Sequence, residues 1–409
     1  MANADTLPIS TKRGTRSALM PDRNVPIGYL RWFVTVLVVM HHAVLAYDSQ
    51  MPKPGAPMTQ VPTIWALSPV VDPARWAGFD LLVAFNDIFF MSLMFFISGL
   101  FVAGSLERKG AFAFAWDRIK RLGLPFVAAS AIIAPLAYYP SYLQAGHFDV
   151  PFWKTWLSLS FWPSGPAWFV WVLLAFGLVA AVLQLIARGW ASGLGRLARR
   201  ADTRMWKFWL GLVLVSGAAY ITLSIVFDPY SWLSWGPFSV QSSRMLHYAV
   251  FFLAGIAVGA FGVDKGLLAP DGKLARRWWL LPIIAVLAFA VLMAIVIAAS
   301  VTKAQPSVAL WEAVGGAGFA VSCAASSFML LALFVRFAKR RNAVFDSLER
   351  NAYGIYLVHY AFVSWIQYAL LPVQLGGLAK GAIAFAAALA SSWMFTALLR
   401  RVPPIARII

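Results

Sequence analysis

Ten long apolar segments dominate the sequence and restrict the chain to a membrane. A helix needs about 20 apolar residues to cross a hydrocarbon core about 30 Å thick. Segments of that length are residues 28–47, 82–104, 122–139, 166–187, 206–226, 243–262, 278–300, 310–335, 352–371 and 376–399. Only 12% of the residues are charged, against about 25% in a soluble domain. We therefore predict an all-α, polytopic membrane protein, a bundle of about ten transmembrane helices.

The positions of the basic residues predict how these helices are oriented. Of the 34 Lys and Arg residues, 27 lie in the N-terminal tail, in alternate connections or after the last segment. Cytoplasmic loops carry the excess of Lys and Arg, so both termini are expected to be cytoplasmic. This distribution also accounts for the net charge of +18, and nucleic acid is not predicted as a partner.

The chain is expected to divide into three parts. Residues 1–27 are polar and basic and should form a disordered cytoplasmic tail, residues 28–400 a single membrane domain, and residues 401–409 a short cytoplasmic tail. The first apolar segment does not resemble a cleavable signal peptide, because it is too long and contains Arg31 and two histidines. No soluble catalytic domain is apparent, so we expect any chemistry to take place within the membrane bundle.

Ionisable side chains inside the apolar segments mark the candidate functional positions, because each costs about 2.5–3.5 kcal/mol at the centre of a membrane helix. These residues are Arg31, His41, His42, Asp87, Arg244, His247, Glu312 and His359. Arg31 and His42 are eleven residues apart, which places both on one helix face, roughly 16 Å apart along the axis. The alternative is purely structural: Arg31 would reach the headgroups and the histidines would bond to neighbouring helices.

Helix rise also suggests a partner for His42. His42 lies about 21 Å from the inner face and Asp87 about 8 Å from the outer face, so the two depths coincide in a core of about 30 Å. We predict that Asp87, or its neighbour Asn86, hydrogen-bonds to His42 and orients it, as an acidic residue does in hydrolase triads. The alternative is that Asp87 lies within reach of the outer headgroups.

Five stretches resemble motifs of the membrane-bound acyltransferase type 3 family, in the same order. They are Arg31 and His42 with ten residues between them, FFISG at 95–99, RIKRLGLP at 118–125, GPAWFVWVLL at 165–174 and NAYGIYLVHYAF at 351–362. The resemblance covers residues 25 to about 400. FND at 85–87 and QSSR at 241–244 are similar to the branch that contains the periplasmic-glucan succinyltransferase. Many relatives have an acidic residue three positions before the Arg, where this chain has Gly28.

The resemblance implies an acyl-CoA-dependent O-acyltransferase in the inner (plasma) membrane. Such an enzyme moves an acetyl or succinyl group from cytoplasmic acyl-CoA to a hydroxyl of a glycan or other carbohydrate. His42 would be the general base, and Arg31 and Asp87 the other catalytic residues. Substrate contacts are expected from Arg118, Arg121, Trp168, Arg244, Tyr356 and His359. No bound cofactor or metal is expected, acyl-CoA is the donor substrate, and a homo-oligomer is left open.

Two other functions are compatible with such a chain. A transporter or flippase for a sugar or lipid-linked sugar could use the buried Arg, His and Asp residues as a proton relay. Against it, the sequence shows no internal repeat and no pair of Gly/Pro-broken segments in matching halves. A non-catalytic membrane partner in polysaccharide assembly is the third alternative. No P-loop, HExxH or dinucleotide motif is present, and the single cysteine, Cys323, excludes a disulfide framework.

Overall fold

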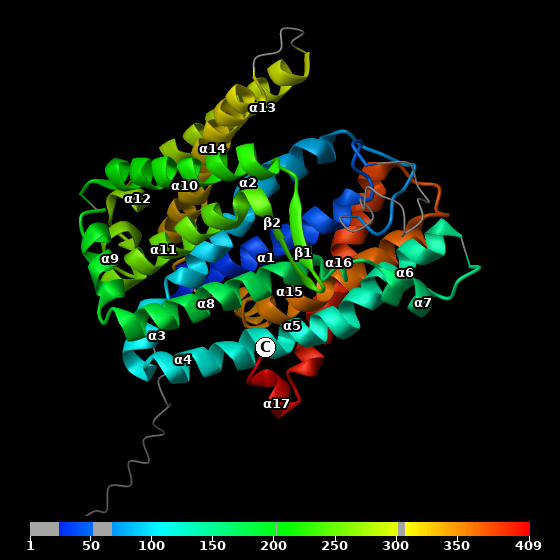
Figure 1. Ribbon diagram of the computed structural model, residues 1–409, viewed down its shortest axis with the longest axis horizontal. Coiled ribbons are helices and arrows are strands. Elements are labelled where there is room, and N and C mark those ends of the chain that lie inside the picture. Colours follow the sequence, from blue (N-terminus) through cyan, green and yellow to red (C-terminus); the bar gives the residue numbers. More distant parts are fainter. Residues whose placement is uncertain (1–23, 52–67, 147, 202, 302–306) are drawn as a thin grey trace, which may run out of the picture.

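The computed structural model describes residues 24–51, 68–146, 148–201, 203–301 and 307–409 (Figure 1). Most of the predicted N-terminal tail lies outside these residues. The first helix begins at Val25, three residues before the predicted start of the membrane domain. Asn24 caps it, because its side-chain oxygen accepts the Ile27 amide at 3.1 Å.

Long helices occupy all ten predicted positions. They are α1 (Val25–Leu45), α2 (Gly78–Gly99) with α3 (Val102–Lys109), a bent helix over 111–145, α8 (Trp168–Ile186), α10 (Met205–Phe227), α11 (Met245–Phe261), α13 (Leu280–Val301), α14 (Val308–Phe337), α15 (Ala343–Leu370) and α16 (Gly377–Leu399). The bent helix comprises α4 (Ala111–Arg118), η2 (Ile119–Gly123), α5 (Leu124–Ala128), η3 (Ala129–Ile133) and α6 (Ala134–Ala145). The all-α, polytopic prediction is confirmed.

Shorter elements lie between or after these helices. They are α7 (Phe152–Ser158), α9 (Trp190–Ala198), α12 (Lys273–Arg276), α17 (Pro403–Ala406), and the 3-10 turns η4 (Gly165–Ala167), η5 (Ser242–Arg244) and η6 (Gly266–Leu268). The only strands in the described residues are β1 (Trp232–Trp235) and β2 (Phe238–Gln241), an antiparallel hairpin in which Trp232 lies opposite Gln241. The hairpin, which the sequence analysis did not predict, joins α10 to α11.

Nine helices of the described chain are long and apolar enough to cross a membrane, and α15 is the exception. Its 28 residues suffice in length, but they include Asp346, Glu349, Asn351, His359 and Gln367. These polar residues are tolerated because α15 packs against α1, α6 and α16, which shield it from lipid. In Figure 1, α1 runs through the middle of the bundle beside α15, while α13 and the start of α14 project from one edge.

Contacts of α1, α15 and α16 give the relative directions of these three helices. The partners of Arg31 and His42 in α15 are Glu349 and His359, so α1 and α15 run the same way. Gly354 of α15 lies against Thr396 of α16, whose chain runs in the opposite direction. Parallel first and ninth helices and an antiparallel tenth are what a strictly alternating ten-helix chain requires.

Two glycines of α11 allow it to lie directly against α2. A Cβ atom added at Gly255 would be 2.1 Å from the Phe96 carbonyl oxygen, and one at Gly259 would meet the Leu100 carbonyl oxygen as closely. Spaced four residues apart, they form a GxxxG pattern, which lets membrane helices approach until their backbones touch. This contact fixes α11, and with it the Arg244 that precedes the helix, against α2.

A buried ion pair attaches the connection between α1 and α2 to the start of α16. Lys380 Nζ lies 2.7 Å from Asp72 Oδ2, with side-chain exposures of 3% and 1%. The backbone of Asp72 is itself held, because its amide donates to the Ala46 carbonyl at 2.9 Å. Both charges are sealed from solvent, so this pair has the environment of a structural ion pair.

Prolines and π-helical turns interrupt the helix over 111–145, and α15 donates hydrogen bonds to two carbonyls that lie four residues before a proline. In a regular helix the amide of residue 125 would donate to the Arg121 carbonyl, but Pro125 has no N–H. The Arg121 carbonyl accepts the Tyr353 hydroxyl at 2.8 Å. Pro140 likewise cannot donate to the Leu136 carbonyl, which accepts Trp365 Nε1 at 3.0 Å. In lipid, where no water is available, such carbonyls must find partners within the protein.

Tyr353→Phe should therefore destabilise the protein. Removing the hydroxyl leaves the Arg121 carbonyl without this donor, at a cost of about 1–2 kcal/mol. Thermal unfolding of the protein in lipid nanodiscs measures the effect. Tyr139→Phe is the matched control, because the Tyr139 hydroxyl makes no hydrogen bond within the described residues. Equal midpoints for the two variants would contradict this account of the bent helix.

Candidate functional site

His42 is the most exposed of the histidines that the structure describes. Of the histidines in the described residues, His41 is 8% exposed and His247 and His359 are fully buried, whereas His42 is partly exposed. Its ring packs edge-on against Tyr360, with ring centres 5.1 Å apart. The His41 and His359 rings lie at similar distances, 5.3 and 5.1 Å.

The hydrogen bonds of His42 define which of its nitrogens is free. Nδ1 lies 2.8 Å from the Val38 carbonyl oxygen; a carbonyl only accepts, so Nδ1 carries the proton. In the neutral ring, Nε2 is then the unprotonated nitrogen. His359 Nδ1 lies 2.7 Å from the Tyr356 carbonyl oxygen, so Nδ1 carries the proton here too. The lone pair of His359 Nε2 therefore faces His42 Nδ1 at 3.3 Å.

The C-terminal end of α1 places a partial negative charge beside His42. The last four carbonyls of a helix have no partner within it, and together they act as roughly half a negative charge. α1 ends at Leu45, so His42 lies in its last turn. Gln367 Nε2 donates to the His42 and Ala43 carbonyls at 2.9 and 3.0 Å, which fixes this turn against α15.

Asp87 is bonded to Arg244 and not, as predicted, to His42. Arg244 donates from Nη2 to Asp87 Oδ2 at 2.5 Å and from Nη1 to the Asp87 carbonyl at 3.0 Å. The two hydrogen bonds of the His42 ring go to Val38 and His359. The helix rise predicted the depth of Asp87 on α2, but it could not predict that α2 presents the carboxylate toward α11.

Arg31 pairs with a carboxylate that the sequence analysis did not identify. Its Nη2 lies 3.8 Å from Glu349 Oε1, with side-chain exposures of 42% for Arg31 and 5% for Glu349. The Glu349 carboxyl fills the space beside Gly28, where an added Cβ would be 2.2 Å from Oε1. The absence of an acidic residue at position 28 is thus matched by one that reaches the same place from α15.

The remaining predicted substrate contacts are dispersed. Arg118 lies over the Phe114 ring, with its guanidinium carbon 5.0 Å from the ring centre, and Arg121 pairs with Asp117 at 3.2 Å. Tyr356 is buried and donates its hydroxyl to the Pro166 carbonyl, so it holds α15 to the start of α8. Trp168 is partly exposed and stacks on Tyr248, with ring centres 5.7 Å apart.

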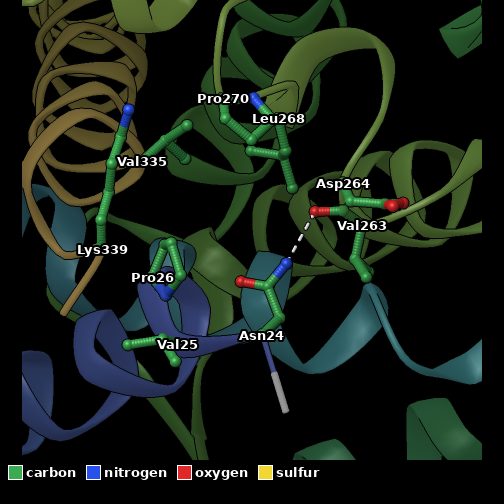
Figure 2. A pocket seen from close by; sticks show the side chains of 9 residues that line it. All are labelled: Asn24, Val25, Pro26, Val263, Asp264, Leu268, Pro270, Val335 and Lys339. Atoms are coloured by element: carbon green, nitrogen blue, oxygen red, sulfur yellow. Dashed lines mark hydrogen bonds between the residues drawn. The ribbon is translucent and has the colours of Figure 1, made fainter. Parts of the chain in front are cut away.

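A separate pocket of about 300 Å³ lies at the N-terminal end of α1 (Figure 2). Its lining includes Lys339 and Asp264, and Asn24 Nδ2 donates to the Val263 carbonyl at 2.9 Å at its edge. One cation and one carboxylate cancel, so the pocket offers no excess of positive charge to a phosphate. We assign it no part in the site.

The candidate site thus lies between α1 and α15, with Asp87 on α2 and Arg244 in the turn η5 that precedes α11. Sequence reasoning missed Glu349 because it lies before the apolar segment 352–371, and it missed Gln367, inside that segment, because only ionisable side chains were considered. Many relatives have an acidic residue at the position of Gly28, and its absence here could have indicated that a carboxylate from another helix, Glu349, pairs with Arg31. Among the described residues, no group of three or more His, Cys, Asp or Glu side chains is placed to hold a metal ion.

These features define a multi-pass membrane protein with a polar site inside its helix bundle. A family model described as an acyltransferase domain matches residues 25–397, nearly the whole chain. The protein therefore belongs to the type 3 acyltransferase family and is a membrane acyltransferase. The comparison with curated proteins gave no match, and neither did the comparison with solved structures.

The fit of Glu349 beside Gly28 can be tested by a double-mutant cycle. Gly28→Ala puts a Cβ where the Glu349 carboxyl lies, and such overpacking costs about 1–3 kcal/mol. Glu349→Ala removes the counter-charge of Arg31 and also destabilises the protein. In the double variant the new methyl group enters vacated space. The loss of stability of the double variant should therefore be at least about 1 kcal/mol smaller than the sum of the two single losses. Additive losses in thermal unfolding would contradict the observed packing.

Proposed function

We propose that the protein transfers an acyl group from cytoplasmic acyl-CoA to a hydroxyl of a carbohydrate, with His42 as general base. Acetyl and succinyl are the candidate acyl groups, and the bacterial inner membrane is the proposed location. The observation that carries the proposal is the state of His42: it is the most exposed histidine among those described, and its hydrogen bonds leave Nε2 unprotonated. A sugar hydroxyl is weakly acidic, so its attack on a thioester requires such a base.

The proposed reaction uses the lone pair of the unprotonated His42 Nε2. The hydroxyl oxygen attacks the thioester carbonyl as His42 Nε2 takes its proton. A C–O bond forms, the C–S bond breaks, and the proton then passes from Nε2 to the leaving thiolate, which is released as free CoA. The products are the ester and CoA-SH, and the imidazole returns to its starting state. The thioester is already activated, so no oxidant or nucleotide hydrolysis is needed.

His359 is proposed as a positioning residue and not as the substrate contact that the sequence suggested. It is fully buried, so its ring acts through His42. Its Nε2 lone pair faces the Nδ1–H of His42 and stabilises the imidazolium that forms when Nε2 gains a proton. The carbonyl end of α1 acts in the same direction, because it stabilises positive charge in the last turn.

Arg31 is proposed to hold a phosphate of the donor. It lies eleven residues from His42 on α1, or roughly 16 Å along the axis. An extended pantetheine arm has the backbone length of about four amino-acid residues, roughly 14 Å. A phosphate at the guanidinium would therefore bring the thioester to the depth of His42. Arg118 and Arg121, on the bent helix, are further candidates for the adenosine phosphates of CoA.

Mass spectrometry of cellular glycans tests the proposed function. Strains carry the wild type, His42→Ala or Met40→Ala, a control that shortens a partly exposed side chain on the same helix. We expect an acyl mass in the wild type and in Met40→Ala, and its loss in His42→Ala, since losing a general base lowers rates about 10²–10⁴-fold. Membrane levels of each protein are measured alongside. Identical spectra from all three strains would contradict a carbohydrate acceptor.

A further inference from the structure

The short helix α9 lies at one end of the bundle. Figure 1 shows it between the ends of α8 and α10, which it connects. It packs against α11 through small residues: Ala191, Gly195 and Ala198 are buried, and a Cβ atom added at Gly195 would lie 3.1 Å from the Ala260 Cβ. Its other sides therefore face away from α11.

The two remaining sides of α9 differ in chemical character. With 3.6 residues per turn, its three arginines fall within an arc of about 100°, and all are exposed: Arg196, Arg199 and Arg200. The large apolar side chains lie on the opposite side of the helix, and they are Trp190, Leu194 and Leu197. Leu197 is 72% exposed. One basic side and one apolar side are typical of a helix that lies in the plane of a membrane interface.

Tryptophans indicate that α9 lies at the depth of the headgroups. Trp206 and Trp209 are in the first turns of α10, and Trp278 and Trp279, 36% and 57% exposed, directly precede α13. The Arg277 guanidinium carbon is 5.5 Å from the centre of the Trp206 ring, so both helices start at one level. Tryptophan is enriched where membrane helices meet the headgroups. Since α9 leads directly into α10, its arginines can reach lipid phosphates and its apolar side the acyl chains.

The positive charge of this region is not neutralised within the described part of the protein. Residues 188–207 contain six Lys and Arg residues and one acidic residue, a net charge of +5. None of the three α9 arginines forms an ion pair with the described residues. Lys273 Nζ donates to the Thr203 carbonyl at 2.8 Å, which brings α12 and its exposed Arg276 beside the same region.

We propose that α9 is a binding surface for anionic phospholipids of the leaflet in which it lies. The arginines attract the lipid phosphates, and the planar guanidinium group can donate two parallel hydrogen bonds to a phosphate. Leu197 extends toward the acyl chains. Lipids with a net negative charge are favoured over zwitterionic ones, because the surface has an excess of positive charge. A lipid bound to α9 stabilises the folded bundle, because α9 packs on α11.

The test uses the full chain in a non-ionic detergent. Dioctanoyl phosphatidylglycerol is the anionic probe and dioctanoyl phosphatidylcholine the zwitterionic one, and the rise in the thermal midpoint gives an apparent Kd for each. We expect phosphatidylglycerol to bind at least about 10-fold more tightly. Raising NaCl from about 0.05 M to about 0.5 M should weaken its binding at least about 10-fold, because salt screens exposed charges. Phosphatidylcholine binding should change less than about 2-fold.

Two triple variants locate the effect on the protein. Arg196→Gln, Arg199→Gln and Arg200→Gln together should weaken phosphatidylglycerol binding at least about 10-fold. The matched control removes three exposed arginines at and after the end of α14, and it should change this binding less than about 2-fold. Its substitutions are Arg336→Gln, Arg340→Gln and Arg341→Gln.

Equal affinity for the two lipids, or equal losses in the two triple variants, would overturn the proposal. An unchanged affinity for phosphatidylglycerol in the folded α9 variant would do the same. So would a loss of CoA binding in that variant without a loss of phosphatidylglycerol binding, because the surface would then hold the phosphates of an acyl donor. The salt series needs no variant, and it provides the test if the α9 variant does not fold.

Discussion

The parallel contact between α1 and α15 organises the whole site. At one end Glu349 of α15 faces Arg31 across the space left by Gly28. Three turns further along α1, His359 and Gln367 of α15 hold the ring and the carbonyl of His42. Because both helices run the same way, one rigid interface keeps the proposed phosphate anchor and the proposed base at a fixed separation.

The membrane explains why α15 is the most polar of the long helices. A polar group in lipid has no water to bond with, so each must be satisfied inside the protein. α15 supplies such partners: Tyr353 and Trp365 donate to carbonyls to which Pro125 and Pro140 cannot donate, and its other face carries His359. A helix with this role cannot also be strongly apolar, and it is shielded by α1, α6 and α16.

Hydropathy and charge predicted the architecture well, because the lipid core imposes a length on every spanning helix. The prediction that Arg31 and His42 share one face of a helix is also confirmed, since both lie on the side of α1 that faces α15. Contacts between helices were not predictable in this way. Asp87 faces α11 because glycines bring α11 against α2, and His359 lies behind His42 through the packing of α15. The direction of a side chain around a helix axis is set by tertiary packing, which one sequence does not encode locally.

The coupling between His42 and His359 tests the central claim most directly. We would measure kcat/KM for acyl-CoA in nanodiscs for the wild type, His42→Gln, His359→Gln and the double variant. If His359 acts only through His42, then His359→Gln lowers the rate by about 10-fold or more in the wild type, but by less than about 2-fold once His42 is replaced. The same loss in both backgrounds would contradict the account, because His359 would then act independently of the base.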